Sequence, residues 1–162
     1  MGKVGREKIM KVDVSKMILI DTIMKKDIKD DLSIYSLTVE AKQFILNKKW
    51  CKNIINGYLA KSIEGIMCVY FFEIEPSQKN IDNYLWVIVG DIPPAYLVID
   101  NSPDANSAIN TYVNEMRIWI KAVKNNESLE NIIPLNVPPE EKYADMLETR
   151  MVFIEKKILN TI

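Results

Sequence analysis

Apolar residues form continuous runs in the middle of the chain and recur every three to four residues in its last third. The segments 65–75 and 85–89 are almost uninterrupted apolar runs, which are typical of strands covered on both faces. The segments 53–61 and 95–99 also predict strands. All connections between these strands are short, whereas a parallel neighbour needs a crossover of about a dozen residues. We therefore predict an antiparallel meander.

A first C-terminal helix is predicted by the spacing of apolar residues between positions 105 and 123. Asp104 is a suitable N-cap, because its carboxylate can accept a hydrogen bond from a backbone N–H of the first turn. Asn125 and Asn126 are expected to end this helix.

A second C-terminal helix is predicted after the stiff, proline-bearing segment 134–139. Pro139 suits the first helical position, and Glu140 and Glu141 complement the positive end of the helix dipole. The buried stripe of this helix is expected to consist of Tyr143, Leu147, Met151, Ile154 and Ile158, with Met146 and Phe153 beside it.

The N-terminal part gives weaker patterns. Thr38 is the predicted N-cap of a helix that buries Val39, Ala41, Phe44 and Ile45 and ends near Lys48. The segment 14–24 fits a helix or a strand, and its lack of alternation favours a helix. Residues 1–12 are basic and polar, and we expect a flexible lead-in.

Together these elements predict the α+β class. We expect a single domain over residues 1–162, with an antiparallel sheet of about four strands, two long C-terminal helices and one or two N-terminal helices. The length of 162 residues and the 48% of hydrophobic residues fit one ordinary globular domain.

Charge and hydropathy limit the partners and the compartment. The net charge is −1, so no bulk field attracts nucleic acid or an anionic membrane, and we expect neither as a partner. The apolar run 66–72 is far shorter than the roughly 20 residues of a membrane span. The run 17–20 is too short for the core of a signal peptide, so we predict a cytoplasmic protein.

The absence of histidine excludes several kinds of site. No Ser-His-Asp triad, Cys-His pair or His-ligated zinc site can be built from this chain, and its two cysteines cannot form a four-thiolate metal site. The chain also lacks the glycine-rich GxGxxG and GxxxxGK[ST] nucleotide loops. We therefore expect no cofactor and no metal, and any catalysis would have to use carboxylates, lysines, tyrosines, hydroxyls or thiols.

The first candidate site is the segment between the predicted strands 85–89 and 95–99. Gly90 and two successive prolines predict a rigid corner, which by itself explains their presence as a connection between strands. The functional alternative is a stiff loop that presents binding residues to a partner. The candidate binding residues are Asp91, Pro93, Pro94 and Tyr96.

Two other groups of residues are candidates for chemistry. Cys51 lies near Lys48, Lys49 and Lys52, whose charge could lower the pKa of its thiol, but a buried cysteine that fills the core is the more common case. Glu73 and Glu75 share one face of a predicted strand, and a solvated strand end explains them better than an acid–base or metal site.

Tyr and Trp are enriched in cores and at interfaces, so the aromatic residues are candidate contact residues. Most of them fall on inward-facing positions of the predicted elements. Tyr96 is the one expected to reach solvent. The residues considered are Tyr84, Trp86, Tyr96, Tyr112 and Trp119.

Four segments resemble a family of small bacterial proteins that share a G-D-[IL]-P-P-A-Y core after an apolar strand. They are WCKNIINGYLAKSIEGIMCVYFFEIEP, LWVIVGDIPPAYLVID, INTYVNEMRIWIKAV and IIPLNVPPEEKYADML. The resemblance covers roughly residues 45–159, whereas residues 1–35 match no known pattern. It implies a bacterial, intracellular, single-domain protein and brings with it no activity, cofactor or catalytic residue.

Two functional hypotheses follow from these observations. The first is a non-enzymatic module that binds another protein, in the manner of an immunity-type or regulatory partner, or binds a second copy of itself. The alternative is a small enzyme or ligand-binding domain that uses a carboxylate, Lys or Cys group in a pocket between sheet and helices. The lack of convergent titratable groups favours the first.

Overall fold

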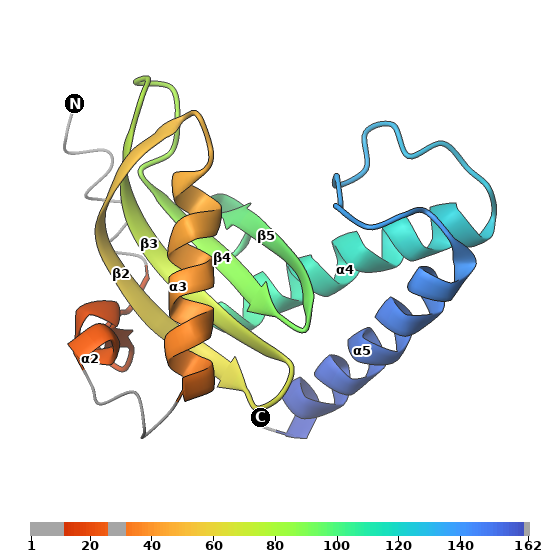
Figure 1. Cartoon of the computed structure of the whole chain (residues 1–162), viewed down its shortest axis with the longest axis horizontal. Helices are drawn as coiled ribbons and strands as arrows, with labels where there is room; N and C mark the ends of the chain where they lie inside the picture. Colours follow the sequence, from red (N-terminus) through yellow and green to blue (C-terminus); the bar gives the residue numbers. More distant parts are fainter. Residues whose placement is uncertain (1–11, 26–31, 161–162) are drawn as a thin grey trace.

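The computed structural model describes residues 12–25 and 32–160 (Figure 1). Its centre is an antiparallel sheet of five strands, in which each strand pairs with the next one along the chain. The predicted α+β class and the antiparallel meander are confirmed, with one short strand more than expected. The strands are β1 (Ile18–Leu19), β2 (Cys51–Ile63), β3 (Met67–Pro76), β4 (Tyr84–Gly90) and β5 (Ile92–Val98).

Helices cover both faces of this sheet. Figure 1 shows α3 lying across one face, while α4 starts on the opposite face and continues beyond the sheet, and α5 returns along α4. A single 3-10 turn, η1 (Ile99–Asn101), connects β5 to the segment before α4. The helices are α2 (Ile20–Lys25), α3 (Leu32–Leu46), α4 (Ala105–Lys124) and α5 (Glu141–Asn160).

The covered faces explain the continuous apolar runs of the sequence. Successive side chains of a strand point to opposite faces. On β3, Tyr70 and Phe72 pack into the layer under α2 and α3, whereas Val69 and Phe71 pack into the layer under α4. The strand is therefore buried on both sides along most of its length, as the sequence predicts.

The start and end of α4 agree with the prediction. The carboxylate of Asp104 accepts a hydrogen bond from the N–H of Ser107 at 2.8 Å, and the helix ends at Lys124. Its buried stripe includes Ile109, Met116 and Ile120.

The last helix begins later than predicted. Its first residue is Glu141 rather than Pro139, and the carbonyl oxygen of the preceding Glu140 accepts a hydrogen bond from the N–H of Ala144 at 3.2 Å. Ala144 takes the first fully buried position, and Tyr143 is only half-buried. The rest of the predicted stripe is buried, while Met146 and Phe153 are exposed.

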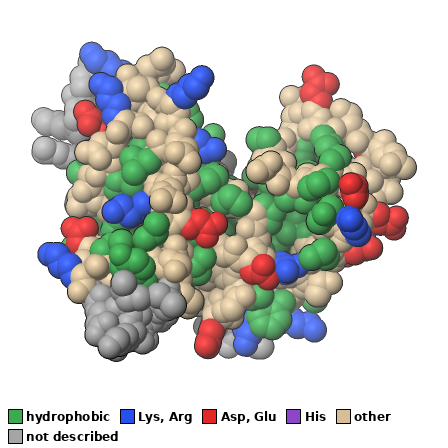
Figure 2. All heavy atoms as spheres, in the orientation of Figure 1, with side chains coloured by type: hydrophobic (Ala, Val, Ile, Leu, Met, Phe, Trp, Pro, Cys, Tyr) green, Lys and Arg blue, Asp and Glu red, His purple; other side chains and the backbone are tan. Residues whose placement is uncertain are grey.

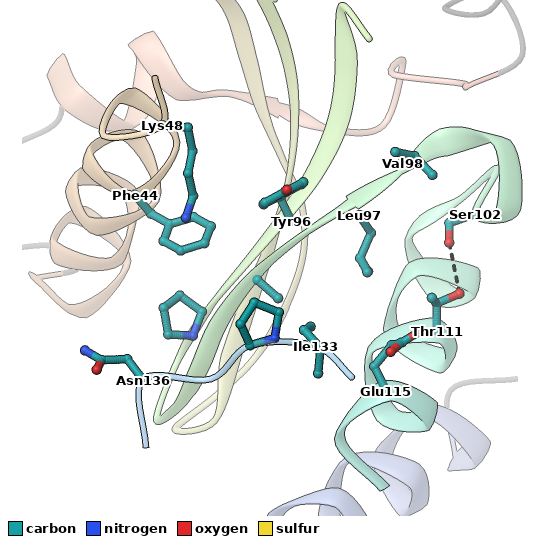
Figure 3. A pocket seen from close by; sticks show the side chains of 13 residues that line it. Phe44, Lys48, Tyr96, Leu97, Val98, Ser102, Thr111, Glu115, Ile133 and Asn136 are labelled. Atoms are coloured by element: carbon teal, nitrogen blue, oxygen red, sulfur yellow. Dashed lines mark hydrogen bonds between the residues drawn. The ribbon is translucent and has the colours of Figure 1, made fainter. Parts of the chain in front are cut away.

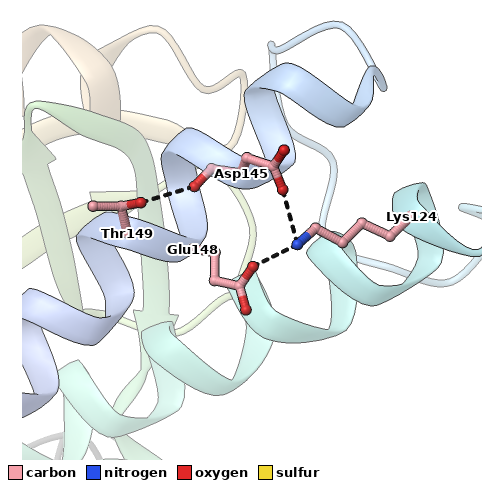
Figure 4. Close-up of polar contacts among 4 residues, drawn as sticks. All are labelled: Lys124, Asp145, Glu148 and Thr149. Atoms are coloured by element: carbon pink, nitrogen blue, oxygen red, sulfur yellow. Dashed lines mark hydrogen bonds and ion pairs between the residues drawn. The ribbon is translucent and has the colours of Figure 1, made fainter.

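Ion pairs connect α4 to α5. The ammonium of Lys124 lies 2.9 Å from a carboxylate oxygen of Asp145 and 2.5 Å from one of Glu148 (Figure 4). The hydrogen bonds to Glu148 and then to Asp145 raise the pKa of Lys124. Arg117 pairs with Glu155 further along the same two helices. The side chains of these ion pairs are all partly exposed to solvent, so they orient the two helices more than they stabilise them.

Thr38 is not the N-cap of a helix. The helix α3 already begins at Leu32, and Thr38 lies in its middle with its side chain fully buried. The hydroxyl donates to the carbonyl oxygen of Ile34 at 2.7 Å and forms a hydrogen bond of 2.8 Å with the hydroxyl of Tyr70. Because these two hydrogen bonds satisfy the hydroxyl, Thr38 can be buried in the middle of a helix.

The segment 14–24, which the sequence allowed to be a helix or a strand, contains one of each. It holds the two-residue strand β1 and most of α2. Val12, at the end of the predicted lead-in, is buried in the layer under α4 and is therefore part of the core. Residues 1–11 of the predicted lead-in lie outside the described residues.

Candidate functional site

The segment that joins β4 to β5 is a tight turn. Only Asp91 separates the two strands, and Gly90 before it has a φ of +149°, a conformation that residues with a Cβ rarely adopt. The N–H of Asp91 donates to the carbonyl oxygen of Ile66 at 2.8 Å, which ties this turn to the neighbouring β2–β3 connection.

Pro93 and Pro94 lie inside β5 and not in a corner. This corrects the prediction, and the position of the strand gives the reason. In the described part of the chain the sheet ends at β5, so the N–H groups on the outer edge of this strand need no partner and proline is tolerated there. The pairing also shifts register between Ile88 and Gly90, opposite these prolines. The hydroxyl of Tyr112 donates to the carbonyl oxygen of Pro93 at 2.6 Å and so joins this part of the edge to α4.

The structure separates the candidate binding residues into two groups. Asp91 points to α5, where one of its carboxylate oxygens accepts hydrogen bonds from Nη2 and Nε of Arg150 at 2.9 and 3.1 Å. Pro94 and Tyr96 line a groove of about 470 Å³, which Asp91 and Pro93 do not line. The candidate site is therefore this groove, and Asp91 belongs to a surface ion pair outside it.

The groove runs along the outer edge of β5. Five successive residues, 94–98, line it, although their side chains alternate between the two faces of the sheet. A cavity over one face would meet only every second residue, so this cavity lies beside the strand. Figure 2 shows the hollow between the part of the molecule that holds the sheet and α3 and the part that holds α4 and the following connection.

Two different walls enclose the groove (Figure 3). Phe44 from the last turn of α3 and Lys48 from the turn that follows form one wall. The opposite wall contains Glu115 of α4, and a short stretch of the connection to α5, 133–136, closes the groove further along.

Aromatic contacts hold the α3 wall in place. The ring of Tyr96 packs edge-on against Trp50, with 5.0 Å between the ring centroids. The ammonium of Lys48 lies 4.4 Å from the centroid of Phe44 and 5.7 Å from that of Tyr96, within the range of cation–π attraction. Tyr96 is 41% exposed, whereas the other four aromatic residues considered from the sequence are buried, so that prediction is confirmed.

Among the described residues, none pairs with the outer edge of β5 after the two prolines. The strand pairs with β4 on one side only, and within the described residues no other segment forms a hydrogen bond with the backbone of residues 95–98. Alternate residues of an edge strand direct both their N–H and C=O groups outward. These groups face the groove and can pair with another extended chain.

Cys51 lies outside the groove and does not have the surroundings of a reactive thiol. Its side chain is 6% exposed, and its sulfur lies 3.7 Å from the carbonyl oxygen of Asn53. Burial raises the pKa of the Cys51 thiol, which is the opposite of what a nucleophilic cysteine needs. The core-filling role is the one its surroundings support.

Thiol labelling tests this assignment. We expect iodoacetamide to modify Cys51 in the folded protein at least about tenfold more slowly than in urea, because the thiol is shielded and its thiolate fraction is low. Cys68, which is also buried, serves as the internal control. Mass spectrometry of the digested protein reads both sites, and rapid modification of Cys51 alone would restore it as a reactive thiol.

The carboxylates singled out from the sequence are also outside the groove. Glu73 accepts hydrogen bonds from the side-chain amide of Asn56 at 2.9 Å and from the hydroxyl of Tyr84 at 3.2 Å. Glu75 is exposed at the end of β3. Among the residues that the structure describes, no three acidic, cysteine or histidine side chains gather as metal ligands would.

Sequence reasoning missed the two charged residues of the groove. Lys48 was singled out only as a residue near a predicted helix end and as one of the lysines beside Cys51, and Glu115 was not singled out at all. Nothing in the local pattern distinguishes them from other surface charges, because their relation comes from the packing of α3 and α4 on opposite sides of one strand.

Comparison of the chain with protein families, with curated proteins and with solved structures gave no match. The resemblance to a bacterial family therefore stays a prediction. Over the described parts of the chain, no helix combines the length and apolarity that a membrane crossing requires.

Proposed function

We propose that this protein is a non-enzymatic interaction module that binds an extended peptide segment of another protein along the outer edge of β5. The observation that carries the proposal is the groove itself, since its floor is a strand edge with which no described segment pairs. In strand addition, main-chain hydrogen bonds supply affinity and side-chain contacts supply specificity. Immunity-type or regulatory binding would both use such a surface.

The exposed side chains of the groove support binding by another protein. Tyr96 and Val98 are 41% and 40% exposed and lie on the edge strand, so a bound segment would cover apolar surface that is now in contact with water. Pro93 and Pro94 restrict pairing to the four residues that follow them. Such a short edge suits a peptide segment better than a long strand of a second sheet.

A second copy of this chain is a poorer occupant. Two β5 strands that paired in antiparallel fashion about a twofold axis would place equal faces of the two sheets side by side. Lys48 would then approach the partner's Lys48, and Glu115 the partner's Glu115. Like charges at close range oppose such a pairing.

Binding of a small ligand is the second candidate function. A volume of about 470 Å³ lies within the range of small-molecule pockets, and Lys48 and Glu115 could orient a ligand there. This second function predicts that small polar compounds raise the melting temperature of the protein and that no peptide binds in the groove.

Peptide selection tests the proposed function. The immobilised protein is challenged with a phage-displayed library of random eight-residue segments, and selected segments are synthesised for fluorescence anisotropy. We expect the variant Val98→Lys to lose at least about tenfold in affinity, because a lysine on an edge strand obstructs pairing. The matched control is Val152→Lys, since Val152 on α5 is also 40% exposed and lies outside the groove.

The peptide backbone provides a second readout. In an added strand only alternate N–H groups face β5, so N-methylation of one alternate set should abolish binding, and methylation of the other set should be tolerated. Selection of no peptide, equal loss in both lysine variants, or indifference to both methylation patterns would each refute peptide binding along β5.

A further inference from the structure

We infer that the groove selects extended segments in which an acidic and a basic side chain stand an odd number of positions apart. This inference rests on the proposed strand addition and specifies the chemistry of the partner. Its basis is a pair of opposite charges on opposite walls of the groove, Lys48 and Glu115.

Lys48 offers a positive charge to the groove that no described acidic side chain neutralises. The residue is half-buried, and its ammonium lies against the rings of Phe44 and Tyr96 without an ion pair to any described residue. The two rings restrict the ammonium to the α3 wall. A carboxylate on a bound segment would gain both the charge attraction and a direct hydrogen bond there.

Glu115 offers the opposite charge on the other wall. It is half-buried and forms no ion pair or side-chain hydrogen bond with the described residues, although Arg117 and Lys124, further along α4, are both paired with α5. A partly desolvated charge without a partner in an apolar groove favours binding of a group of opposite sign.

The two charges lie on opposite faces of the plane that an added strand would occupy. Figure 3 shows Lys48 with Phe44 on the α3 side of β5 and Glu115 on the α4 side. A strand added to β5 continues the sheet, so its side chains point alternately to the α3 side and to the α4 side. An acidic residue that faces Lys48 and a basic residue that faces Glu115 must therefore be separated by one or three positions, and not by two.

The spacing of charges among selected segments tests the inference. The random eight-residue library is selected on the original protein and, separately, on the variants Lys48→Glu and Glu115→Lys. The original protein should enrich acidic–basic pairs at odd separations. Lys48→Glu should replace the acidic preference by a basic one, so that two basic residues appear at odd separations, and Glu115→Lys should give two acidic residues in the same way.

Affinities of synthetic peptides give the magnitude. Moving the basic residue of a selected segment by one position, from an odd to an even separation, should weaken binding about three- to fivefold, as expected for the loss of one partly exposed ion pair. The same segment should bind about three- to fivefold more weakly to Lys48→Glu and unchanged to Lys52→Glu, since Lys52 is exposed outside the groove.

The possible failures can be told apart. If segments are selected and depend on Val98 but show no odd spacing and no response to Lys48→Glu, the charge rule is wrong while peptide binding along β5 remains. If no segment depends on Val98, peptide binding along β5 is itself wrong. Circular dichroism and the melting temperature of each variant show that the fold is retained.

Discussion

Replacing Gly90 by alanine is expected to lower the free energy of unfolding by about 3 kcal/mol or more, through backbone strain and the loss of a backbone hydrogen bond. A Cβ at this position would lie 2.1 Å from the carbonyl oxygen of Ile66 and 2.7 Å from the Cα of Met67. Both neighbours are backbone atoms, so the β4–β5 turn has to move away from the β2–β3 connection. That movement breaks the hydrogen bond from the N–H of Asp91 to Ile66.

Gly65 provides the matched control for this substitution. It also has a positive φ, of +79°, but nothing lies within 4 Å of a Cβ built there. Gly65→Ala should therefore show only the strain of the left-handed conformation, about 1 kcal/mol. Urea unfolding followed by tryptophan fluorescence measures both variants, and equal losses of stability would contradict the role of close approach at Gly90.

Replacing Trp86 by alanine should destabilise the protein by about 3–5 kcal/mol, the usual result of truncating a fully buried aromatic side chain. Trp86 is 0% exposed, its ring lies 5.0 Å from that of Phe71, and its N–H donates to the carbonyl oxygen of Ser102 at 2.6 Å. The substitution removes the packing between β4 and α4 and the hydrogen bond at once.

The variant Trp86→Phe separates these two contributions. It keeps an aromatic ring but leaves the carbonyl group of Ser102 without its donor, which should cost about 1–3 kcal/mol. Thermal unfolding by circular dichroism gives the comparison. A loss below 1 kcal/mol in Trp86→Ala would show that the layer under α4 can close around the missing ring.

The sheet and the long C-terminal helices could be predicted because their local patterns and their tertiary surroundings agree. The apolar runs that became β3 and β4 are buried on both faces, and Asp104 caps α4 as expected. Short connections then left the antiparallel order as the simplest arrangement, and the structure has it.

The remaining differences come from partners that are distant in the sequence. Thr38 suits a helix N-terminus by residue type, but Tyr70 on β3 supplies the hydrogen bond that keeps its hydroxyl inside α3. Pro93 and Pro94 would interrupt a central strand, and only the edge position of β5 permits them there. The groove also depends on contacts between distant segments, since it needs the free edge of β5 and the packing of α3 and α4 on opposite faces of the sheet.

The order of the strands has a consequence for how the protein folds. From β2 to β5 each strand pairs with its successor across a short connection, so these four strands can assemble hairpin by hairpin, whereas β1 joins β2 only across the long segment that holds α2 and α3. The terminal pair of helices can condense afterwards onto a surface that already exists. For these four strands the conformational search is thereby confined to short stretches of chain, which favours rapid collapse to a single topology.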